Sequence, residues 1–375
     1  MSRDMGQAEL RIGVIGTSAF TQQYHLEGLR SHPAARVMAI CGRNRPRAED
    51  VARRYGIPLV FTDYRELIES PDVDAVDIVT PNYLHYPMAM MALEARKHVF
   101  CEKPLGMNAG EAGEMYEKAE SAGVTHMVNF TFRGVPAGMR MKELIDEGYI
   151  GRLYHIYVSF MSPNRRGGMM EWRRDVKQAG TGVLGDMGSH VIDQARWYAG
   201  EITRVSGHLH TAEPELTIPG SGEAVPNETD DSCVMLVEFE SGAHGILHAS
   251  WIAHPGLGGG VIRVEAHGSE GMLQVDYRRA VDPASWARLR GARGEKAVSE
   301  VLPLPAGLTE GLDFSDEPAL VRTLCARPWF TSQRFAEAVL GNREMTPSFY
   351  DGLKAQEVID AAVASHRDGG WVSVV

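Results

Sequence analysis

Short apolar segments alternate with helical patterns through the first 130 residues of this 375-residue chain. The pattern predicts strands at 10–15, 37–41, 75–79, 99–101 and 126–130, with a helix ending near 30 and others at 46–55, 86–95 and 109–122. Strands that alternate with helices lie parallel and are joined by right-handed crossovers, with helices on both faces of the sheet. The region 1–130 is therefore predicted to be an α/β domain with a doubly wound parallel sheet.

The pattern changes after residue 130. The chain then predicts a helix at 137–147, a strand at 152–161, a loop rich in glycine and arginine at 163–182, a helix ending at 198, strands at 205–210, 232–239, 244–251, 261–267 and 272–276, and helices at 332–340 and 350–366. Ser241-Gly242 and Gly268-Ser269 supply hairpin turns between strands. The region 131–375 is therefore predicted to be a second, α+β domain with an open, mainly antiparallel sheet, and the length suits two domains.

The composition of the chain excludes several kinds of binding partner and indicates a cellular compartment. The net charge of −11 argues against nucleic acid and anionic membranes, because both need clustered cations. The four cysteines form no Cys-x-x-Cys pair, which argues against a zinc ribbon or a disulfide scaffold and favours a reducing compartment. The segment 1–9 lacks the apolar core of a signal peptide, and no apolar run approaches the roughly 20 residues of a membrane span. We expect a cytoplasmic protein.

One strand bears on assembly. Residues 233–237 are apolar at every position, which predicts a strand buried on both faces. Helices of the same chain can cover only one side of such a sheet, so we expect a second subunit on the other side and a homo-oligomer, a dimer or tetramer. The alternative is a strand enclosed entirely within one chain.

The segment 98–104 is the first candidate site. An apolar run ends abruptly in Glu102, Lys103 and Pro104. Ligands of open α/β sheets bind just beyond the carboxyl ends of the strands, so Lys103 lies where a substrate is expected. The alternative is a strand end that is polar only because it meets water.

A dinucleotide signal follows the first strand. Strand, turn and helix are arranged so that phosphates would meet backbone amides at a helix N-terminus. The usual fingerprint G-x-G-x-x-G reads here as Gly16, Ser18 and Thr21, so that only the first glycine is present. The candidate cofactor-binding residues of the turn are Gly16, Thr17, Ser18, Ala19 and Phe20. Ser18 must let the backbone approach the pyrophosphate or give its own hydroxyl to a phosphate.

The end of the second strand bears on the choice of cofactor. A chain that selects NAD usually has a carboxylate here for the ribose hydroxyls, and this chain has Arg43 and Asn44 instead. The guanidinium of Arg43 can pair with a 2′-phosphate, so NADP(H) is favoured and NAD(H) stays possible. The alternative is an ordinary surface arginine.

The helix after residue 182 carries a second candidate group. Its apolar positions repeat every three or four residues, and Asp186, His190, Asp193 and Trp197 share another stripe. Asp186 and His190 thus lie one turn apart, an arrangement typical of general base catalysis by an imidazole. A surface pair is the alternative. A metal site is not expected, because no clustered Cys/His pattern accompanies the pair.

Together these residues resemble the glucose–fructose oxidoreductase, inositol dehydrogenase and rhizopine-catabolism (Gfo/Idh/MocA) family of oxidoreductases. The resemblance covers nearly the whole chain. It is carried by the Gly16 turn, Thr80-Pro81-Asn82 with His85, the segment 97–104, Asn129 with Arg133, the segment 182–193 and Asp351-Gly352-Leu353. Ser18 departs from the family pattern, which usually has glycine there.

The resemblance implies a Rossmann domain, a substrate domain whose open sheet is often used for oligomerisation, and hydride transfer on sugars, inositols or related polyols. It implies that Lys103 hydrogen-bonds the reacting oxygen, that His190 exchanges the proton and that Asp186 supports it. Cofactor contacts are implied for Glu102 and Asn129, near the nicotinamide ribose and amide, and for Thr80, Pro81, Asn82 and His85. Arg133, Trp172 and Arg173 are further candidates for holding substrate, with interdomain packing as the alternative.

Two other functions stay open. One is a glycoside hydrolase that oxidises its substrate transiently with a bound nicotinamide cofactor, a known variation in this family. The other is a non-catalytic sensor that keeps the dinucleotide fold, although such a protein is expected to have lost Lys103 or His190. The loop 164–168 is either a lid over bound ligand or a connector.

Overall fold

The computed structural model describes residues 9–278, 282, 286–295 and 297–375. Residues 1–8, on which the expectation of no signal peptide rests, lie outside this part. The chain forms two compact units, each described here by itself. The parallel-sheet unit contains Met1–Gly106, Gly110–Asn129 and Pro318–Leu353, and the mixed-sheet unit contains Met107–Ala109, Phe130–Glu317 and Lys354–Val375.

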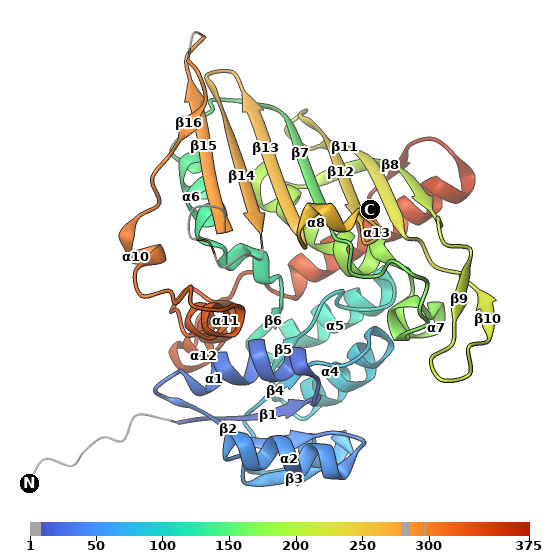
Figure 1. Ribbon diagram of the computed structural model, residues 1–375. Helices are drawn as coiled ribbons and strands as arrows, with labels where there is room; N and C mark the ends of the chain where they lie inside the picture. The colour runs from blue at the N-terminus through green and yellow to red at the C-terminus, as the bar shows by residue number, and fades with distance from the viewer. Residues whose placement is uncertain (1–8, 279–281, 283–285, 296) are drawn as a thin grey trace, which may run out of the picture. The chain divides into compact units, whose positions relative to one another are not determined.

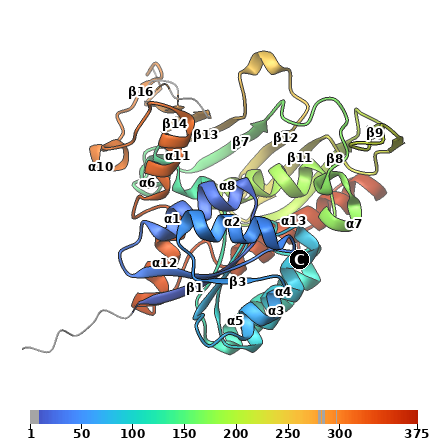
Figure 2. The same cartoon turned by 60° about the horizontal axis from the view of Figure 1, so that its bottom comes forward.

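The parallel-sheet unit is built on six parallel strands in the order β3-β2-β1-β4-β5-β6 (Figure 1). The strands are β1 Leu10–Ile15, β2 Ala35–Cys41, β3 Leu59–Phe61, β4 Ala75–Ile78, β5 His98–Cys101 and β6 His126–Val128. The helices are η1 Thr21–Leu26, α1 Glu27–Arg30, α2 Arg45–Tyr55, α3 Tyr64–Glu69, η2 Asn82–Leu84, α4 His85–Glu94, α5 Ala109–Ala122, α11 Glu317–Cys325 and α12 Thr331–Gly341. With α1 and α2 on one face and α3, α4 and α5 on the other (Figure 2), the predicted doubly wound sheet is confirmed.

Strand β4, at the centre of this sheet, is buried along its whole length. All four residues of β4 are buried, as expected for a strand covered by helices on both faces. One of these four residues is an acid, Asp77, which has no exposed surface. A carboxylate without solvent is costly unless it is paired, so Asp77 must have a partner inside the unit.

Residues 318–353 belong to the parallel-sheet unit, whereas the predicted division 1–130 and 131–375 put them in the second domain. The reason is packing between segments far apart in the sequence. The ring of Phe335 on α12 stacks on Phe100 of β5 with 5.3 Å between centroids, and Gln333 donates to the carbonyl of Gly28. A Cβ at Gly28 would lie 2.1 Å from the Ser332 hydroxyl, so the glycine permits α1 and α12 to approach closely.

The mixed-sheet unit has a nine-stranded sheet in the order β16-β15-β14-β13-β7-β12-β11-β8-β17 (Figure 1). Its strands are β7 Leu153–Met161, β8 Ile202–His210, β11 Ser232–Phe239, β12 His244–Ser250, β13 Val261–Gly268, β14 Gly271–Arg278, β15 Ala287–Arg293, β16 Glu300–Val301 and β17 Val372–Ser373, with β9 Glu215–Thr217 and β10 Ala224–Pro226 as a separate hairpin. Its helices are η3 Thr131–Gly134, α6 Pro136–Asp146, η4 Trp172–Arg174, α7 Val176–Ala179, η5 Leu184–Gly188, α8 Ser189–Ala199, η6 Pro255–Leu257, α10 Ala306–Thr309 and α13 Phe349–Asp368, whose first turn belongs to the other unit. All neighbouring strands are antiparallel except β7 and β12, which confirms the predicted mainly antiparallel sheet.

The apolar strand β11 is buried on one face only within this chain. Cys233, Met235 and Val237 are buried, while Val234 and Leu236 are 36% and 44% exposed. The expectation of burial on both faces is therefore not met inside one chain. Residues on the two faces of a strand alternate, so η5 contacts the buried set and the other set stays accessible.

Phe335→Ala tests the place of α12 in the parallel-sheet unit. The variant removes a fully buried ring and leaves a cavity against β5, so we expect a loss of ~3–5 kcal/mol in the free energy of unfolding. Urea unfolding gives the magnitude, and hydrogen exchange should rise first in β1 and β5. Val298→Ala, at a side chain that is 86% exposed, is the control and should change little. Faster exchange confined to β7–β15 would contradict the assignment.

Candidate active site

Three strands of the parallel sheet end at one edge, and each is followed by predicted site residues. In the strand register, Ile78 of β4 pairs with Cys101 of β5, which pairs with Val128 of β6. The segments that follow these strands therefore leave the sheet at nearly the same height along the strands. They are Thr80-Pro81-Asn82, Glu102-Lys103 and Asn129. Glu102 and Asn129 are buried and Lys103 is half-buried, with a cis peptide bond between Lys103 and Pro104. This edge is the place where an open α/β sheet binds its ligand.

A buried histidine that the sequence did not single out lies behind these residues. His25 comes from η1, and its Nδ1 lies 2.9 and 3.0 Å from the two carboxylate oxygens of Asp77. Its Nε2 lies 2.9 Å from Oε1 of Glu102, and the Asn129 amide donates to the same oxygen at 2.5 Å. Asp77 thus finds its partner, and the four residues form one network, which we call the His25 network.

The electrostatics of this network follow from its two acids. Burial disfavours the charged imidazole, but Asp77 and Glu102 outweigh that effect and raise the pKa of His25 to about 10. Burial would raise the pKa of Glu102, but the hydrogen bond and charge of His25, together with Lys103 and Asn129, lower it to about 2. His25 is therefore an imidazolium and Glu102 a carboxylate throughout the neutral range.

One atom at this edge points to a bound group. Oδ1 of Asn129 is buried and has no hydrogen-bond partner among the described residues. Buried carbonyl oxygens are rarely left without a donor. An N–H donor such as the carboxamide of a nicotinamide would satisfy it, so the residues present fit the cofactor that the turn after β1 predicts.

The turn after β1 differs in detail from the expected phosphate loop. Gly16 has φ +135°, and a Cβ there would lie 2.3 Å from the carbonyl oxygen of Val79, so only glycine fits. The Ser18 hydroxyl accepts from the amide of Thr21 at 3.0 Å and lies 2.8 Å from its hydroxyl. Ser18 therefore caps its own helix. Ser18, Ala19 and Phe20 are exposed and Thr17 is half-buried.

Arg43 and Asn44 follow β2, and both are exposed. The carbonyl oxygen of the Asn44 side chain accepts from the amide of Arg47 at 3.0 Å, which makes Asn44 the N-cap of α2. The Asn44 side chain therefore supports the fold, whereas Arg43, the other predicted cofactor contact here, does not cap a helix.

His85 lies under the same edge. Its ring has no exposed surface, with Nδ1 2.8 Å from the carbonyl of Pro104 and Nε2 3.0 Å from that of Thr80. Burial lowers the pKa of His85, and the two carbonyl acceptors oppose that shift. The ring thereby links the segments after β4 and β5. Asn82 is buried, while Thr80 and Pro81 are half-buried.

In the mixed-sheet unit, Asp186 and His190 lie in η5 and α8 as the helical spacing predicts. Asp186 is half-buried, with Oδ1 3.4 Å from Nε of Arg173 and Oδ2 3.8 Å from the guanidinium of Arg165. His190 is 8% exposed, and its ring meets that of Phe132 edge-on at 4.6 Å. The acid thus lies beside cations, and the imidazole among aromatic rings. The helix after the β1 turn and the helix that carries Asp186 and His190 each contain a π-helical turn, η1 and η5. Such turns are common at functional sites.

A second buried acid, also missed in the sequence, fixes the start of this helix. Asp230 accepts from the amides of Gly182 and Leu184 at 2.7 and 2.8 Å. Burial raises the pKa of Asp230 to about 6 despite these bonds. A Cβ at Gly182 would lie 2.1 Å from the Asp230 carbonyl oxygen, which explains the glycine.

Of the three further substrate candidates, Arg133 is buried and pairs with Asp193, its Nε 3.1 Å from both carboxylate oxygens. Trp172 and Arg173 are half-buried, with the guanidinium of Arg173 4.1 Å from the Trp172 ring centroid. Arg173 thus joins Trp172 to Asp186, whereas Arg133 belongs to an internal ion pair.

The loop 164–168 is tied to its surroundings. The amides of Gly167 and Gly168 donate to Glu213 at 2.8 and 3.0 Å, and Arg165 pairs with Glu171. These contacts anchor the loop to Glu213 and Glu171.

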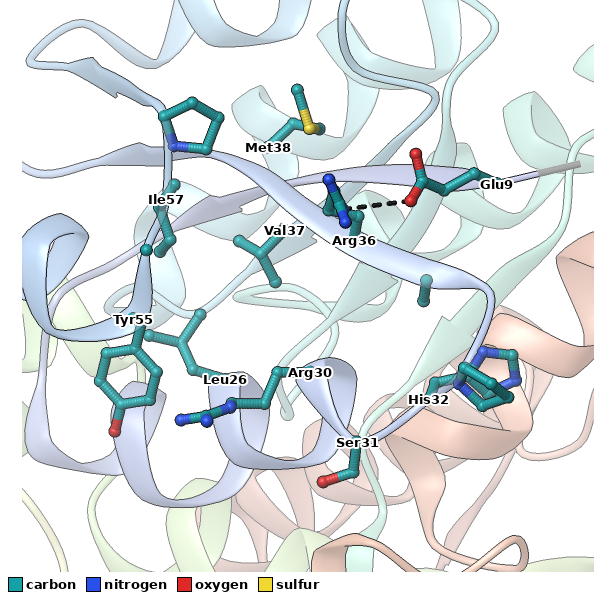
Figure 3. A pocket seen from close by; sticks show the side chains of 14 residues that line it. Glu9, Leu26, Arg30, Ser31, His32, Arg36, Val37, Met38, Tyr55 and Ile57 are labelled. Atoms are coloured by element: carbon teal, nitrogen blue, oxygen red, sulfur yellow. Dashed lines mark ion pairs between the residues drawn. The ribbon is translucent and has the colours of Figure 1, made fainter.

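A cavity of about 680 Å³ lies at the other edge of the parallel sheet (Figure 3). Val37 and Met38 line it from the first half of β2, together with Arg30, His32 and Tyr55. Because it lies at the amino end of β2, it is separate from the site described above. In the described part of the chain, no three histidine, cysteine or acidic side chains lie together as metal ligands, and no helix is long and apolar enough to span a membrane.

Comparison with known proteins identifies the family. Residues 10–130 match the family model described as "Oxidoreductase family, NAD-binding Rossmann fold" (GFO_IDH_MocA), and residues 139–274 match that described as "GFO/IDH/MocA C-terminal domain". These ranges make up more than half of the chain. The chain belongs to the Gfo/Idh/MocA family. It is an enzyme, an oxidoreductase with a Rossmann domain, as the resemblance implied.

Similar proteins include a levoglucosan dehydrogenase from Pseudarthrobacter phenanthrenivorans, 33% identical over 362 residues, or 91% of this chain and 90% of that protein. A scyllo-inositol 2-dehydrogenase (NAD(+)) from Bacillus subtilis is 34% identical over 273 residues, or 72% and 75% of the two chains. A solved levoglucosan dehydrogenase in complex with NADH and levoglucosan matches with a TM-score of 0.85 and 29% identity, over 98% of this chain and 99% of that one.

Proposed function

We propose that this oxidoreductase transfers hydride between a nicotinamide cofactor and a carbinol carbon of a sugar, an inositol or a related polyol. The observation that carries the proposal is the edge formed by Lys103, Glu102 and Asn129: the half-buried Lys103 follows Glu102, and Glu102 holds the Asn129 amide, whose buried oxygen has no partner among the described residues. The relatives named above support the substrate class, since they are called levoglucosan and inositol dehydrogenases.

In this proposal the nicotinamide accepts or gives the hydride, and the chain supplies the polar groups around the substrate hydroxyl. The ammonium of Lys103 hydrogen-bonds the carbinol oxygen and stabilises the negative charge that develops on it. The imidazole of His190 takes the hydroxyl proton, a contribution on the order of 10²–10⁴ in rate. Asp186 supports His190 as an imidazolium, and Arg173 holds the Asp186 carboxylate in place.

The proposal gives each region a role. The parallel-sheet unit binds the dinucleotide through Gly16, Thr17, Ala19, Phe20 and the edge at β4–β6. The mixed-sheet unit binds substrate, with Trp172 and Arg173 beside Asp186. The glycoside hydrolase alternative is not favoured, because the relatives named above are dehydrogenases. It would release an aglycone without net reduction of free cofactor.

Lys103→Met tests the assigned chemistry. The variant keeps most of the side-chain length but loses the cation, so we expect kcat to fall by at least ~10²–10³-fold. Cofactor affinity should stay within a few-fold of the wild-type value, measured by fluorescence titration. Lys118→Met on α5 is the control and should keep full turnover. Turnover is measured by following NAD(H) or NADP(H) absorbance with a panel of aldoses, anhydrosugars, inositols and keto-sugars. Turnover by Lys103→Met near the wild-type rate would rule out the assigned role.

The choice of cofactor is also a proposal. The exposed guanidinium of Arg43 after β2 favours NADP(H), because it can pair with a 2′-phosphate. NAD(H) is the competing cofactor, and the relatives that are named with NADH or NAD(+) support it.

Arg43→Ser separates the two cofactors. If Arg43 binds the 2′-phosphate, the Kd for NADP should rise about tenfold or more while the Kd for NAD changes little, since one charged hydrogen-bonding group is lost. Arg53→Ser, an exposed arginine of α2 paired with Asp50, serves as the control. A wild-type enzyme that binds NAD more tightly than NADP, with Arg43→Ser unchanged, would assign Arg43 to the surface.

We also propose that the open face of the mixed sheet binds a second copy of this chain. Val234, Leu236 and Ile246 are each at least 36% exposed, and Leu236 and Ile246 are cross-strand partners. Adjacent exposed apolar side chains of this kind are typical of subunit interfaces. A dimer or tetramer would complete the burial that the apolar run 233–237 predicts.

Leu236→Lys tests this interface. A lysine in the middle of the patch would be buried without a partner, so the oligomer should dissociate while thermal unfolding of the subunit changes little. Val301→Lys, at a 57% exposed position on β16, is the control and should keep the wild-type mass in light scattering. A wild-type chain that is monomeric at micromolar concentration would exclude the interface.

A further inference from the structure

The His25 network suggests a role for a residue that the proposed chemistry does not use. His25 is 1% exposed, so it cannot itself meet a substrate, yet it joins three elements of the parallel-sheet unit: η1, β4 and the segment after β5. Each of its ring nitrogens faces a carboxylate oxygen. Both must therefore donate, and the ring has the geometry of an imidazolium.

We propose that His25 is a positioning residue of the cofactor site: by bridging Asp77 and Glu102 it fixes the Glu102 carboxylate and the Asn129 amide that face the nicotinamide end of the cofactor. This inference rests on the proposed function, because it takes the edge at β4–β6 as the nicotinamide site.

The contacts of Glu102 show how the effect would pass to the edge. Oε1 accepts from both His25 and Asn129, and Oε2 lies 3.3 Å from the backbone amide of Lys103. Because the Asn129 amide nitrogen is used by Glu102, its carbonyl oxygen points elsewhere, and that oxygen is the buried acceptor without a partner. The bond from Glu102 thus sets which end of the Asn129 amide a ligand meets.

Charge makes the position of His25 hard to replace. It is the one cation that contacts Asp77 in the described contacts, and Asp77 has no exposed surface. The charged and titratable groups around the network are Asp77 on β4, Cys101, Glu102 and Lys103 at the end of β5, and His85 on α4. The rings of Phe20 and Phe100 cover the imidazole, at 5.6 and 5.3 Å between centroids. Without the imidazolium, two acids would be buried side by side and one would hold a proton near neutral pH.

His25→Gln is the decisive variant. An amide can still donate to Glu102 but carries no charge. We expect cofactor affinity at pH 8 to fall by about tenfold or more, and to become dependent on pH between 5 and 8 as the uncompensated acids titrate. The wild type should depend much less on pH in this range, because the pKa of His25 is about 10 and that of Glu102 is about 2. Binding is measured by fluorescence titration without substrate, so this readout does not depend on turnover.

Two further variants distinguish a positioning role of His25 from a general loss of structure. His25→Gln/Asp77→Asn removes the second acid together with the cation, and it should recover much of the affinity and the flat pH profile. His32→Gln is the matched control: His32 is also a buried histidine of this unit and pairs with Glu337 at 3.0 Å, but it lines the cavity at the other edge of the sheet (Figure 3). It should bind cofactor like the wild type.

A measurement on the wild type guards against a variant that does not fold. In ¹⁵N NMR the His25 ring should be doubly protonated at pH 8, and its resonances should shift more when the complete dinucleotide is added than when ADP-ribose, which lacks the nicotinamide, is added.

The outcomes distinguish this inference from the proposed function. A wild type that binds no nicotinamide nucleotide would overturn both. A wild type that binds and turns over, with His25→Gln binding equally and independently of pH or with no NMR shift on adding the dinucleotide, would overturn the role of His25 alone.

Discussion

A buried imidazolium between two carboxylates is the interaction on which the parallel-sheet unit depends most. Asp77 lies in the middle of the buried strand β4, where a carboxylate without a cation is strongly disfavoured. His25 supplies that cation from η1, so the turn after β1 must end in a helix that brings residue 25 over β4. The same ring reaches Glu102, and through it Asn129. One pairing thus fixes the helix after the nucleotide turn and the ends of β5 and β6.

The mixed-sheet unit uses a buried acid in a related way. Asp230 accepts from two amides at the start of η5 and so holds the helix that carries Asp186 and His190. Farther along, Asp193 is paired with Arg133 inside the unit, which fixes the same helix from the side. In both units the polar groups with proposed contacts to ligand lie next to buried pairs that hold the backbone beneath them. Such support is what a site needs to keep catalytic groups in one geometry.

Local sequence patterns predicted most of the helices and strands, and most of the residues that follow β4, β5 and β6 at the edge of the parallel sheet. The strand 10–15, the helix 109–122 and the strand 232–239 have the predicted bounds, because apolar runs and helical periodicity are local properties. The short strand β3 and helix α3 were missed, since three to six residues give little periodicity. The place of α12 depends on Phe335 meeting Phe100, more than 200 residues away, and no local pattern contains such a contact. His25 and Asp77 were missed for the same reason: an acid within an apolar strand and a histidine 52 positions earlier become informative only as a pair. The pattern Asp-Ile at the end of a buried strand was the available signal.

The hydrogen-bond partners of the predicted residues separate them into two classes that sequence alone could not distinguish. The side chain of Asn44 caps a helix, His85 links two carbonyls and Arg133 is bound to Asp193, so their polar groups already serve the fold. Asn129 differs, because Glu102 takes its amide nitrogen and its buried oxygen has no partner among the described residues. A residue that binds a ligand must keep a hydrogen-bonding group available for it. A residue that supports the binding residue uses its hydrogen-bonding groups within the protein. His25, with both nitrogens engaged by acids, belongs to the second class, and for that reason its effect on a ligand has to pass through Glu102.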